Sequence, residues 1–279
     1  MNTLEFTALT CAGSFLAGFL GALTGMGGGI IITPLLTLVL GVDIHYAIGA
    51  TLVSVIATSS GAAAAYVKEG ISNIRIGMFL EIATTVGALA GVKLALRLHS
   101  ASLATIFGLV LLYSAVESLR TRREAPMERP RDRIASFLRM DSSYPSLRGL
   151  RQYRVRAVPA GFGVMFAAGI VSGLLGIGSG ALKVIAMDQV MGIPFKVSTT
   201  TSNFMIGVTA AASAGIYLKR GYVDPLIAMP VMAGVLMGAF LGARVLPKTK
   251  SRVLELVFGA VVAILAIEML YHGLAGRLR

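Results

Sequence analysis

The sequence predicts an all-α, polytopic integral membrane protein built from two homologous repeats, and three observations lead to this fold class. Hydrophobic residues make up 56% of the 279 residues and charged residues only 14%, whereas a soluble domain carries about 25% charged residues. The apolar residues gather in runs of membrane-spanning length, and the pattern of runs occurs twice. Because a soluble core could not absorb this much apolar sequence, we expect a multi-pass protein of the cell membrane.

The apolar runs of the first half lie near residues 5–24, 30–41, 46–67, 74–96 and 101–119. Those of the second half lie near residues 158–175, 181–193, 197–218, 224–246 and 253–275. Most of them approach or exceed the ~20 residues that a helix needs to span a bilayer. The runs at 30–41 and 181–193 are too short, so we expect broken half-helices or re-entrant segments there, and eight to ten segments in all.

The two halves align without a gap when the sequence is shifted against itself by 151 residues. The matches fall on glycines and charges rather than on common Leu and Ala residues. They include Gly25 with Gly176, Gly27 with Gly178, Gly29 with Gly180, Lys68 with Lys219, and Glu117 with Glu268. We therefore divide the chain into a first transmembrane repeat at 1–119, a basic loop at 120–156 and a second repeat at 157–279.

The loop at 120–156 carries many of the arginines behind the net charge of +12. By the positive-inside rule this loop is cytoplasmic, and its charge therefore does not predict a nucleic-acid partner. Within it, Ile134, Phe137 and Leu138 share one helical face, which would suit a helix on an anionic membrane surface or, equally, a solvated linker.

The relative orientation of the repeats depends on the two short runs. If they cross the membrane, each half has five passes and the halves are inverted. If they turn back, each half has four passes and the halves are parallel. We expect inverted repeats, because this arrangement also places the basic residues between Arg244 and Arg252 inside.

Glycine-rich stretches separate the long first run from the short run in each half. The first stretch contains Thr24, Gly25, Met26, Gly27, Gly28 and Gly29, and the second contains Gly176, Gly178, Ser179 and Gly180. Glycine lets a membrane helix unwind, and free N–H groups before a short helix suit an anion. Paired interruptions of this kind point to the substrate site of a transporter. The alternative is close helix packing, which small residues at four-residue spacing also favour.

A lysine and an aspartate lie in the short run that follows the second glycine stretch. Lys183 stands three residues past Gly180, and Asp188 follows in the same run. Ionisable residues at membrane depth are candidates for function, so Lys183 could compensate the charge of an anion. The alternative is a lysine that snorkels or pairs with Asp188.

A polar run from Ser198 to Asn203 opens the next segment. Capping of the helix start accounts for one hydroxyl but not for the whole run. We therefore predict that Thr201, Ser202 and Asn203 hydrogen-bond a substrate oxyanion, together with Thr51, which matches Ser202 in the first half.

Glu81 lies in the middle of the run at 74–96. A buried carboxylate can carry a coupling proton, so Glu81 is our candidate for proton coupling, with a structural hydrogen bond as the alternative. Glu117 and Glu268 lie near the ends of their runs, where we expect interfacial anchors.

We predict no metal site, no cofactor and no enzymatic activity. His45, His99 and His272 are scattered, and Cys11 is the single cysteine, so the sequence shows no cluster with the spacing of metal ligands. No serine accompanies a histidine at a plausible depth. The sequence also lacks the GxxxxGK[ST] motif that would bind a nucleotide.

These residues resemble the sulfite exporter TauE/SafE family over nearly the whole chain apart from the basic loop. In the first half the resemblance rests on Gly25-Met26-Gly27-Gly28-Gly29, Pro34-Leu35-Leu36 and Gly49-Ala50-Thr51. In the second half it rests on Gly176-Ile177-Gly178-Ser179-Gly180, Thr201-Ser202-Asn203 and the Tyr217–Asp224 stretch. Two positions depart from the family, which usually has glycine at Ser179 and often has proline at Ile185.

The resemblance implies a secondary transporter, and specifically an exporter, of a small anion such as sulfite, a sulfonate or a related organic anion. We expect alternating access at the paired glycine-rich breaks, in a bilayer and with a homo-oligomer as an open possibility. The alternatives are an anion channel or an importer with the same fold and, from another class, a membrane scaffold or membrane enzyme.

Overall fold

The computed structural model describes residues 2–24, 28–68, 71–119, 132–146, 149–245 and 251–276. The first half contains α1 (Thr3–Thr24), α2 (Gly29–Pro34), the π-helical turn η1 (Leu35–Val39), α3 (Ile44–Lys68), α4 (Ile74–Ala95) and α5 (Ser100–Leu119). The second contains α7 (Val158–Leu175), α8 (Gly180–Ile185), the π-helical turn η2 (Ala186–Val190), α9 (Phe195–Lys219), α10 (Pro225–Val245) and α11 (Ser251–Leu274). Between them lie α6 (Arg133–Phe137), β1 (Ser142–Ser146) and β2 (Gly149–Tyr153). Among the described residues, six helices are long and apolar enough to cross a membrane, which confirms the predicted all-α membrane fold.

The helix boundaries recur at the spacing found in the sequence. Helices α2 and α8 begin at Gly29 and Gly180, which are 151 residues apart, and the same offset separates the starts of η1 and η2, α3 and α9, α4 and α10, and α5 and α11. π-Helical turns are rare in proteins, so their presence at corresponding places is a specific match. These boundaries support the predicted repeat.

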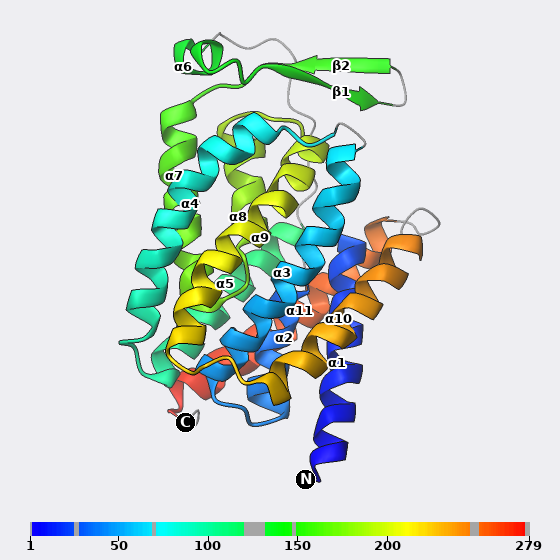
Figure 1. The fold of residues 1–279 in the computed structure, drawn as a ribbon, viewed down its shortest axis with the longest axis vertical. Coiled ribbons are helices and arrows are strands. Elements are labelled where there is room, and N and C mark those ends of the chain that lie inside the picture. The colour runs from blue at the N-terminus through cyan, green and yellow to red at the C-terminus, as the bar shows by residue number, and fades with distance from the viewer. Residues whose placement is uncertain are drawn as a thin grey trace.

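Each short segment turns back along the long helix that precedes it (Figure 1). A Cβ added to Gly28 would stand 3.1 Å from the carbonyl oxygen of Ala17, and one added to Gly13 would meet the side chain of Leu35. Helix α2 and η1 therefore run antiparallel to α1. In the second half, a Cβ on Gly161, near the start of α7, would meet Met191, which follows η2.

Corresponding helices of the two halves run antiparallel where they pack together. A Cβ on Gly49, near the start of α3, would meet the carbonyl oxygen of Tyr222, just after the end of α9, and one on Gly207 would meet Ser59. Helices α5 and α11 are also antiparallel, since Gly108 lies against Leu270 and Gly273 against Thr105. These directions support inverted repeats.

The expectation that turning back would make the halves parallel is therefore wrong. It assumed that the long first helix crosses alone and leaves the chain on the far side. In the structure, that helix and the short segment return the chain together to the side where it began. Three helices then follow in each half, and this odd number inverts the second half relative to the first.

Glycines set the packing between α4 and α7 and between α1 and α10. A Cβ on Gly87 would clash with the carbonyl oxygen of Phe166, and one on Gly91 would clash with that of Ile170. The corresponding Gly238 lies against the backbone of Phe15. Because backbone meets backbone, only glycine fits at these positions, as in other close helix pairs of membrane proteins. The Gly-xxx-Gly spacings at 87–91 and 238–242 therefore mark helix packing.

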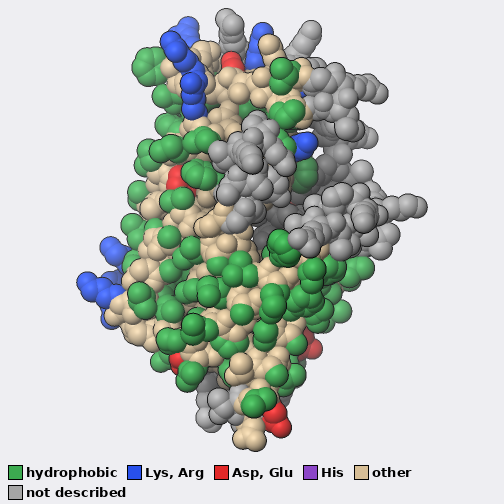
Figure 2. Space-filling model, turned by 45° about the vertical axis from the view of Figure 1, so that its right-hand side comes forward, with side chains coloured by type: hydrophobic (Ala, Val, Ile, Leu, Met, Phe, Trp, Pro, Cys, Tyr) green, Lys and Arg blue, Asp and Glu red, His purple; other side chains and the backbone are tan. Residues whose placement is uncertain are grey.

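The surface of the molecule has an apolar middle and charged ends. On the face shown in Figure 2, hydrophobic side chains cover the middle, and Lys and Arg side chains gather at the end that bears α6 and at one lower edge. Large apolar side chains such as Met78 and Ile82 of α4, Phe240 of α10 and Ile264 of α11 are exposed on the outside of the bundle, as lipid-facing side chains are. Both chain ends lie opposite α6 and the β1–β2 hairpin (Figure 1).

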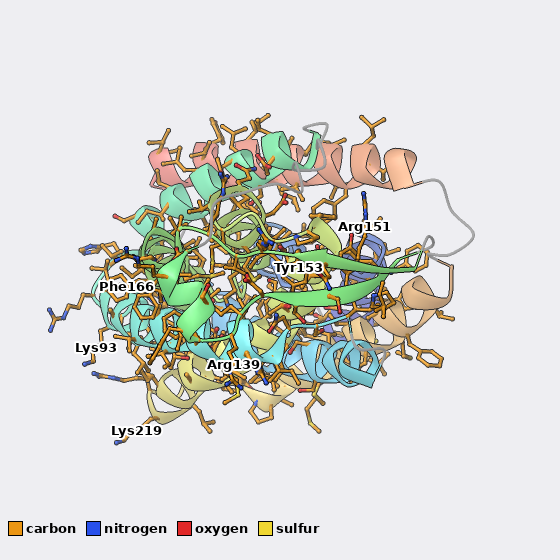
Figure 3. All side chains as sticks on the ribbon, turned by 90° about the horizontal axis from the view of Figure 1, so that it is seen from above. Lys93, Arg139, Arg151, Tyr153, Phe166 and Lys219 are labelled. Atoms are coloured by element: carbon orange, nitrogen blue, oxygen red, sulfur yellow. The ribbon has the colours of Figure 1, made fainter. Side chains whose placement is uncertain are left out.

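The basic loop is partly folded, because α6 and the antiparallel strands β1 and β2 lie over the helix ends (Figure 3). Asn73 joins this region to the membrane helices: its side chain caps α4 at the N–H of Ile76 and donates to Tyr153 Oη at 2.7 Å. Burial raises the pKa of the Tyr153 phenol above its ordinary value. Phe137 is 86% exposed, whereas Leu138 packs against the buried cluster below, so the predicted apolar face of α6 is divided.

We expect the hairpin to lie on the cytoplasmic side, because it belongs to the arginine-rich loop. A Ser143→Cys variant, made in a Cys11→Ala background, places one exposed thiol on β1. This thiol should react with a membrane-impermeant maleimide only after the cells are permeabilised. Labelling of intact cells at the permeabilised level would reverse the orientation.

Candidate functional site

The second glycine-rich break has a backbone that only particular residues adopt easily. Gly176 and Gly178 have φ angles of 67° and 71°, and Ser179 has a φ of 48°. This left-handed region is open to glycine but costs other residues about 1–2 kcal/mol. Glycine would therefore fit the position of Ser179 with less strain. In the first break, Gly25, Met26 and Gly27 lie outside the described residues, Thr24 ends α1, and Gly28 and Gly29 are buried.

The two breaks approach one another near the crossing of α3 and α9. A Cβ on Gly29 would stand 3.7 Å from the Cα of Ile177, in the second break. Val55 of α3 lies against both Gly29 and Gly178, and Ile206, its counterpart on α9, also lies against Gly178. The structure thus brings together two glycine stretches that are distant in the sequence.

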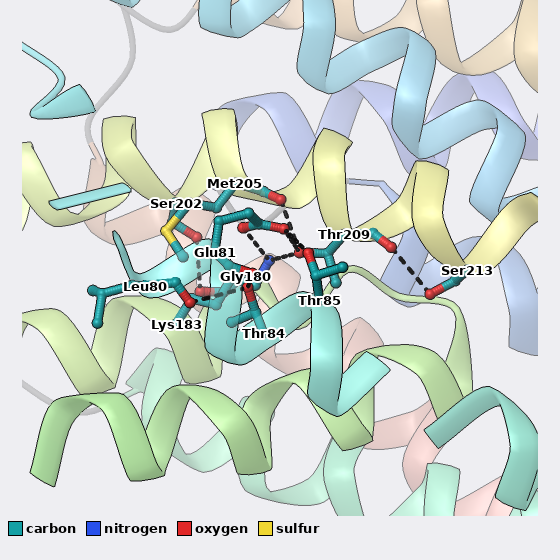
Figure 4. A network of polar contacts seen from close by, with 10 residues as sticks. All are labelled: Leu80, Glu81, Thr84, Thr85, Gly180, Lys183, Ser202, Met205, Thr209 and Ser213. Atoms are coloured by element: carbon teal, nitrogen blue, oxygen red, sulfur yellow. Dashed lines mark hydrogen bonds and ion pairs between the residues drawn. The ribbon is translucent and has the colours of Figure 1, made fainter. Parts of the chain in front are cut away.

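Lys183 and Glu81 form a buried ion pair beside the second break (Figure 4). The Lys183 side chain is fully buried, and its Nζ lies 3.9 Å from Glu81 Oε2. A hydroxyl bridges the two charges, because Lys183 Nζ donates to Thr209 Oγ1 at 2.5 Å and Thr209 Oγ1 lies 2.6 Å from Glu81 Oε1. Thr85 Oγ1 donates to the same carboxylate oxygen at 3.0 Å. Lys183 therefore pairs with Glu81, a partner that neither interpretation of the sequence had named.

Further hydroxyls lie on the elements that pack around this pair. Ser202 Oγ donates to the carbonyl oxygen of Gly180, the first residue of α8, at 3.3 Å. Ser172 of α7 and Ser179, just before α8, are buried, and their hydroxyls make no hydrogen bond within the described residues. Because buried polar atoms are normally hydrogen-bonded, these two hydroxyls are candidates for contact with a ligand.

The first half provides a neutral counterpart of this site. Thr33 Oγ1 donates to Thr51 Oγ1 at 2.9 Å, because Thr51 Oγ1 itself donates to the carbonyl oxygen of Ala47. Ile32 occupies the position that corresponds to Lys183, and Met232 the one that corresponds to Glu81. The charges of the site are therefore asymmetric, as the sequence alignment predicts for Lys183.

The other predicted residues are divided between the site and its surroundings. Thr201 Oγ1 accepts from the backbone N–H of Asn73 at 3.0 Å, at the start of α4. Asn203 is 9% exposed on α9. Glu117 accepts a hydrogen bond from Gln189, and Glu268 pairs with His272 on the surface. Among the described residues, no three potential metal ligands gather.

Sequence reasoning missed Thr209 and Thr85. Thr209 follows Ser202 by seven residues, or two helical turns, so both hydroxyls share one face of α9. Thr85 follows Glu81 by one turn of α4 and shares its face. Helical spacing from the residues already singled out could have indicated both.

The geometry can now be compared with known proteins. A family model described as sulfite exporter TauE/SafE matches residues 10–269. The chain belongs to the TauE/SafE family. This match confirms the resemblance drawn from the glycine-rich stretches.

Relatives in other organisms cover the TauE/SafE chain almost from end to end. The probable membrane transporter protein YunE of Bacillus subtilis is 26% identical over 97% of the chain and 99% of its own length. YdhB of the same organism is 29% identical over 82% of the chain and 86% of its own length. A probable membrane transporter protein of Xylella fastidiosa is 26% identical over 98% of each chain. No solved structure matches the chain. The protein is a multi-pass membrane transporter of the TauE/SafE family.

Ser179→Gly should stabilise this TauE/SafE protein by up to about 1 kcal/mol, because glycine removes the left-handed strain at φ 48°. The Ser179 hydroxyl has no partner to lose in the described residues. Thermal unfolding in detergent measures the change, with Ser143→Gly on exposed β1 as the control. A lower midpoint for Ser179→Gly than for the control would show that the serine conformation is not strained.

Proposed function

We propose that this protein is a secondary transporter that exports a small anion, such as sulfite, a sulfonate or a related organic anion. The single observation that carries the proposal is Lys183, a fully buried cation at the break where α7 gives way to α8. A buried charge in a membrane is costly unless it is paired or used, and such residues mark substrate and ion pathways. The matched family model, named for sulfite export, supports the same substrate class.

Hydroxyls on α7 and in the second break suit the oxygens of an oxyanion. Those of Ser172 and Ser179 are buried without hydrogen-bond partners in the described residues, and a sulfite or sulfonate oxygen would accept from them. The backbone of this break has no side chain at Gly176 or Gly178, where Ile48 and Ile206 pack closely. Among the described residues, Lys183 supplies the positive charge that offsets the cost of removing an anion from water.

Alternating access is the mechanism that the arrangement of helices supports. Two inverted halves meet at α3 and α9, and their interrupted hairpins face one another at Gly29 and Ile177. In transporters built this way, one half rocks against the other around a fixed central site, which opens to each side in turn. The broken helices keep irregular backbone inside the protein, where it does not meet lipid.

Substrate counterflow in proteoliposomes tests the proposed function. Vesicles that contain the purified protein are loaded with unlabelled sulfite and diluted into trace ³⁵S-sulfite, and the assay is repeated with sulfoacetate. A carrier should accumulate label transiently by exchange. Lys183→Gln should lose this accumulation, and Lys219→Gln, on the exposed end of α9, should keep it.

Other results of the same assay would contradict the proposal. A channel would let label equilibrate without a transient excess. A scaffold or enzyme would admit no label at all for either anion. If Lys183→Gln accumulates label as the wild type does, Lys183 does not contribute to substrate binding.

A further inference from the structure

Glu81 is positioned as an internal substitute for the substrate anion. Its Oε1 accepts from Thr209 and Thr85, and its Oε2 faces Lys183 Nζ at 3.9 Å. Oε2 is buried and makes no hydrogen bond within the described residues. The carboxylate therefore neutralises the charge of Lys183 without a direct hydrogen bond to it. The hydroxyl of Thr209 joins the two groups (Figure 4). Such a pair can be separated more easily than one in direct contact.

No other charge of the described residues faces this pair. Helix α7, which packs against both α4 and α8, has no titratable residue between Val158 and Leu175. On α4, the Arg75 guanidinium donates to the carbonyl oxygen of Arg139, and Lys93 lies in the last turn. On α9, the charged residues Lys196 and Lys219 lie in the first and last turns. Asp188 of η2, which has an interaction of its own, follows Lys183 by five residues.

The charge balance of the site then requires a proton. With Lys183 and Glu81 alone, the buried site is neutral. An anion bound to Lys183 would leave one uncompensated negative charge on Glu81 in a medium of low dielectric constant. Like charges close together and burial both favour the protonated form of a carboxyl group.

We propose that the anion and a proton bind together, the anion at Lys183 in place of the Glu81 carboxylate and the proton on Glu81 itself. This inference rests on the proposed function and adds its coupling ion. The balance is one anion and one proton taken up, with Lys183 charged throughout and Glu81 converted from carboxylate to carboxylic acid.

Thr209 allows this exchange without leaving a buried donor unpaired. Its Oγ1 lies 2.6 Å from Glu81 Oε1 and 2.9 Å from the carbonyl oxygen of Met205. When Glu81 is a carboxylate, Thr209 donates to it. When Glu81 is protonated, the acid donates to Thr209 and the threonine proton turns to Met205. The site thus has an acceptor ready for either state, as buried polar groups require.

The direction of coupling follows from joint binding. A monovalent anion and its proton cross in the same direction with no net charge moved. A difference of one pH unit then balances about a tenfold anion gradient. When the outside is more acidic than the cytoplasm, the proton gradient opposes export. Export then proceeds only if the ratio of internal to external anion concentration exceeds the ratio of external to internal proton concentration.

The test measures proton and anion movement in the same vesicles. Proteoliposomes contain the purified full chain and the pH dye pyranine, and an inward gradient of ³⁵S-methanesulfonate is imposed at a clamped potential of zero. Methanesulfonate is monovalent and is the anion of a strong acid, so it carries no proton of its own across the membrane. The wild type should acidify the lumen beyond protein-free vesicles, in proportion to the label taken up.

Variants of the three residues assign the roles. Glu81→Gln leaves Lys183 free, so methanesulfonate exchange should persist with a several-fold higher affinity and lose its pH dependence and its proton movement. Thr209→Val should shift the pH profile of exchange, and Thr209→Ser should restore it. Glu268→Gln, an exposed carboxylate on α11, is the control and should behave as the wild type.

The outcomes separate the inference from the function on which it rests. Methanesulfonate counterflow by the wild type without any proton movement would overturn the coupling and leave the transporter intact. The coupling would also fail if Glu81→Gln, recovered as a monodisperse folded protein, still moved protons with methanesulfonate. If Glu81→Gln is not recovered folded, the wild-type proton-to-anion ratio decides, and a ratio of zero contradicts the inference. Absence of counterflow for every anion would reject the transporter itself.

Discussion

Gly91→Val should destabilise the protein by about 3 kcal/mol or more, because its side chain has no room between α4 and α7. The first carbon of that side chain would clash with the carbonyl oxygen of Ile170. Overpacking of a well-packed interface costs about 1–3 kcal/mol, and more where the neighbour cannot move. A backbone oxygen inside a helix cannot rotate away, so the two helices must separate. Thermal unfolding and gel filtration in detergent measure the effect.

The same helix pair provides a matched control. Gly163 of α7 has open space around the position of a Cβ, within 4 Å, so Gly163→Val should change stability by no more than about 0.5 kcal/mol. Gly238→Val, in the equivalent pair of α1 and α10, should behave like Gly91→Val, since Gly238 meets the backbone of Phe15. Equal melting temperatures for Gly91→Val and Gly163→Val would mean that α4 and α7 do not pack as described.

Lys183→Met should also destabilise the protein strongly, by about 3–5 kcal/mol, because it leaves Glu81 buried without its counter-charge. Adding Glu81→Met should restore most of that loss, since a buried ion pair can often be replaced by apolar side chains of similar size with little cost. The two single variants and the double variant form a thermodynamic cycle. The free energy of unfolding is measured for each above pH 7, where a free carboxyl is ionised.

The sign of the coupling energy decides this prediction. A double variant that is more stable than either single variant shows that Lys183 and Glu81 depend on one another. If the losses of the two single variants simply add, the charges do not interact and the pair in Figure 4 is not formed. The double variant should in either case have no sulfite exchange, because it lacks the cation.

The sequence predicted the plan of the fold because that plan rests on local patterns. Run length placed the long helices, and the break before Gly29 and Gly180 appeared as glycine clusters flanked by apolar runs. The path of the short segments could not be read in the same way. Whether α2 crosses or turns back depends on its packing against α1 at Ala17, a tertiary contact that length alone does not determine. The β1–β2 hairpin was missed for a similar reason, since its stretch reads as a charged linker.

The sequence indicated the individual residues of the candidate site but not which of them lie together in space. Lys183 and Glu81 stood out because each is a charge inside an apolar run, yet they belong to different halves and their counterparts are Ile32 and Met232. The internal repeat therefore carried no sign that they pair. Thr201 shows the opposite kind of error. Its polar neighbours in the sequence suggested contact with the substrate, but in the structure its hydroxyl accepts a hydrogen bond from the N–H of Asn73.

The packing of helices of one half against helices of the other has a consequence for how the protein folds during synthesis. The closest helix pairs, α1 with α10, α4 with α7, α5 with α11 and α3 with α9, each join one half to the other. When the ribosome has inserted only the first half, the glycine faces of α1 and α4 have no helix to meet. The first half therefore gains its most extensive helix contacts only when the second half is synthesised. Stability of this molecule is acquired in one late step, and two separately expressed halves should need each other to survive in the membrane.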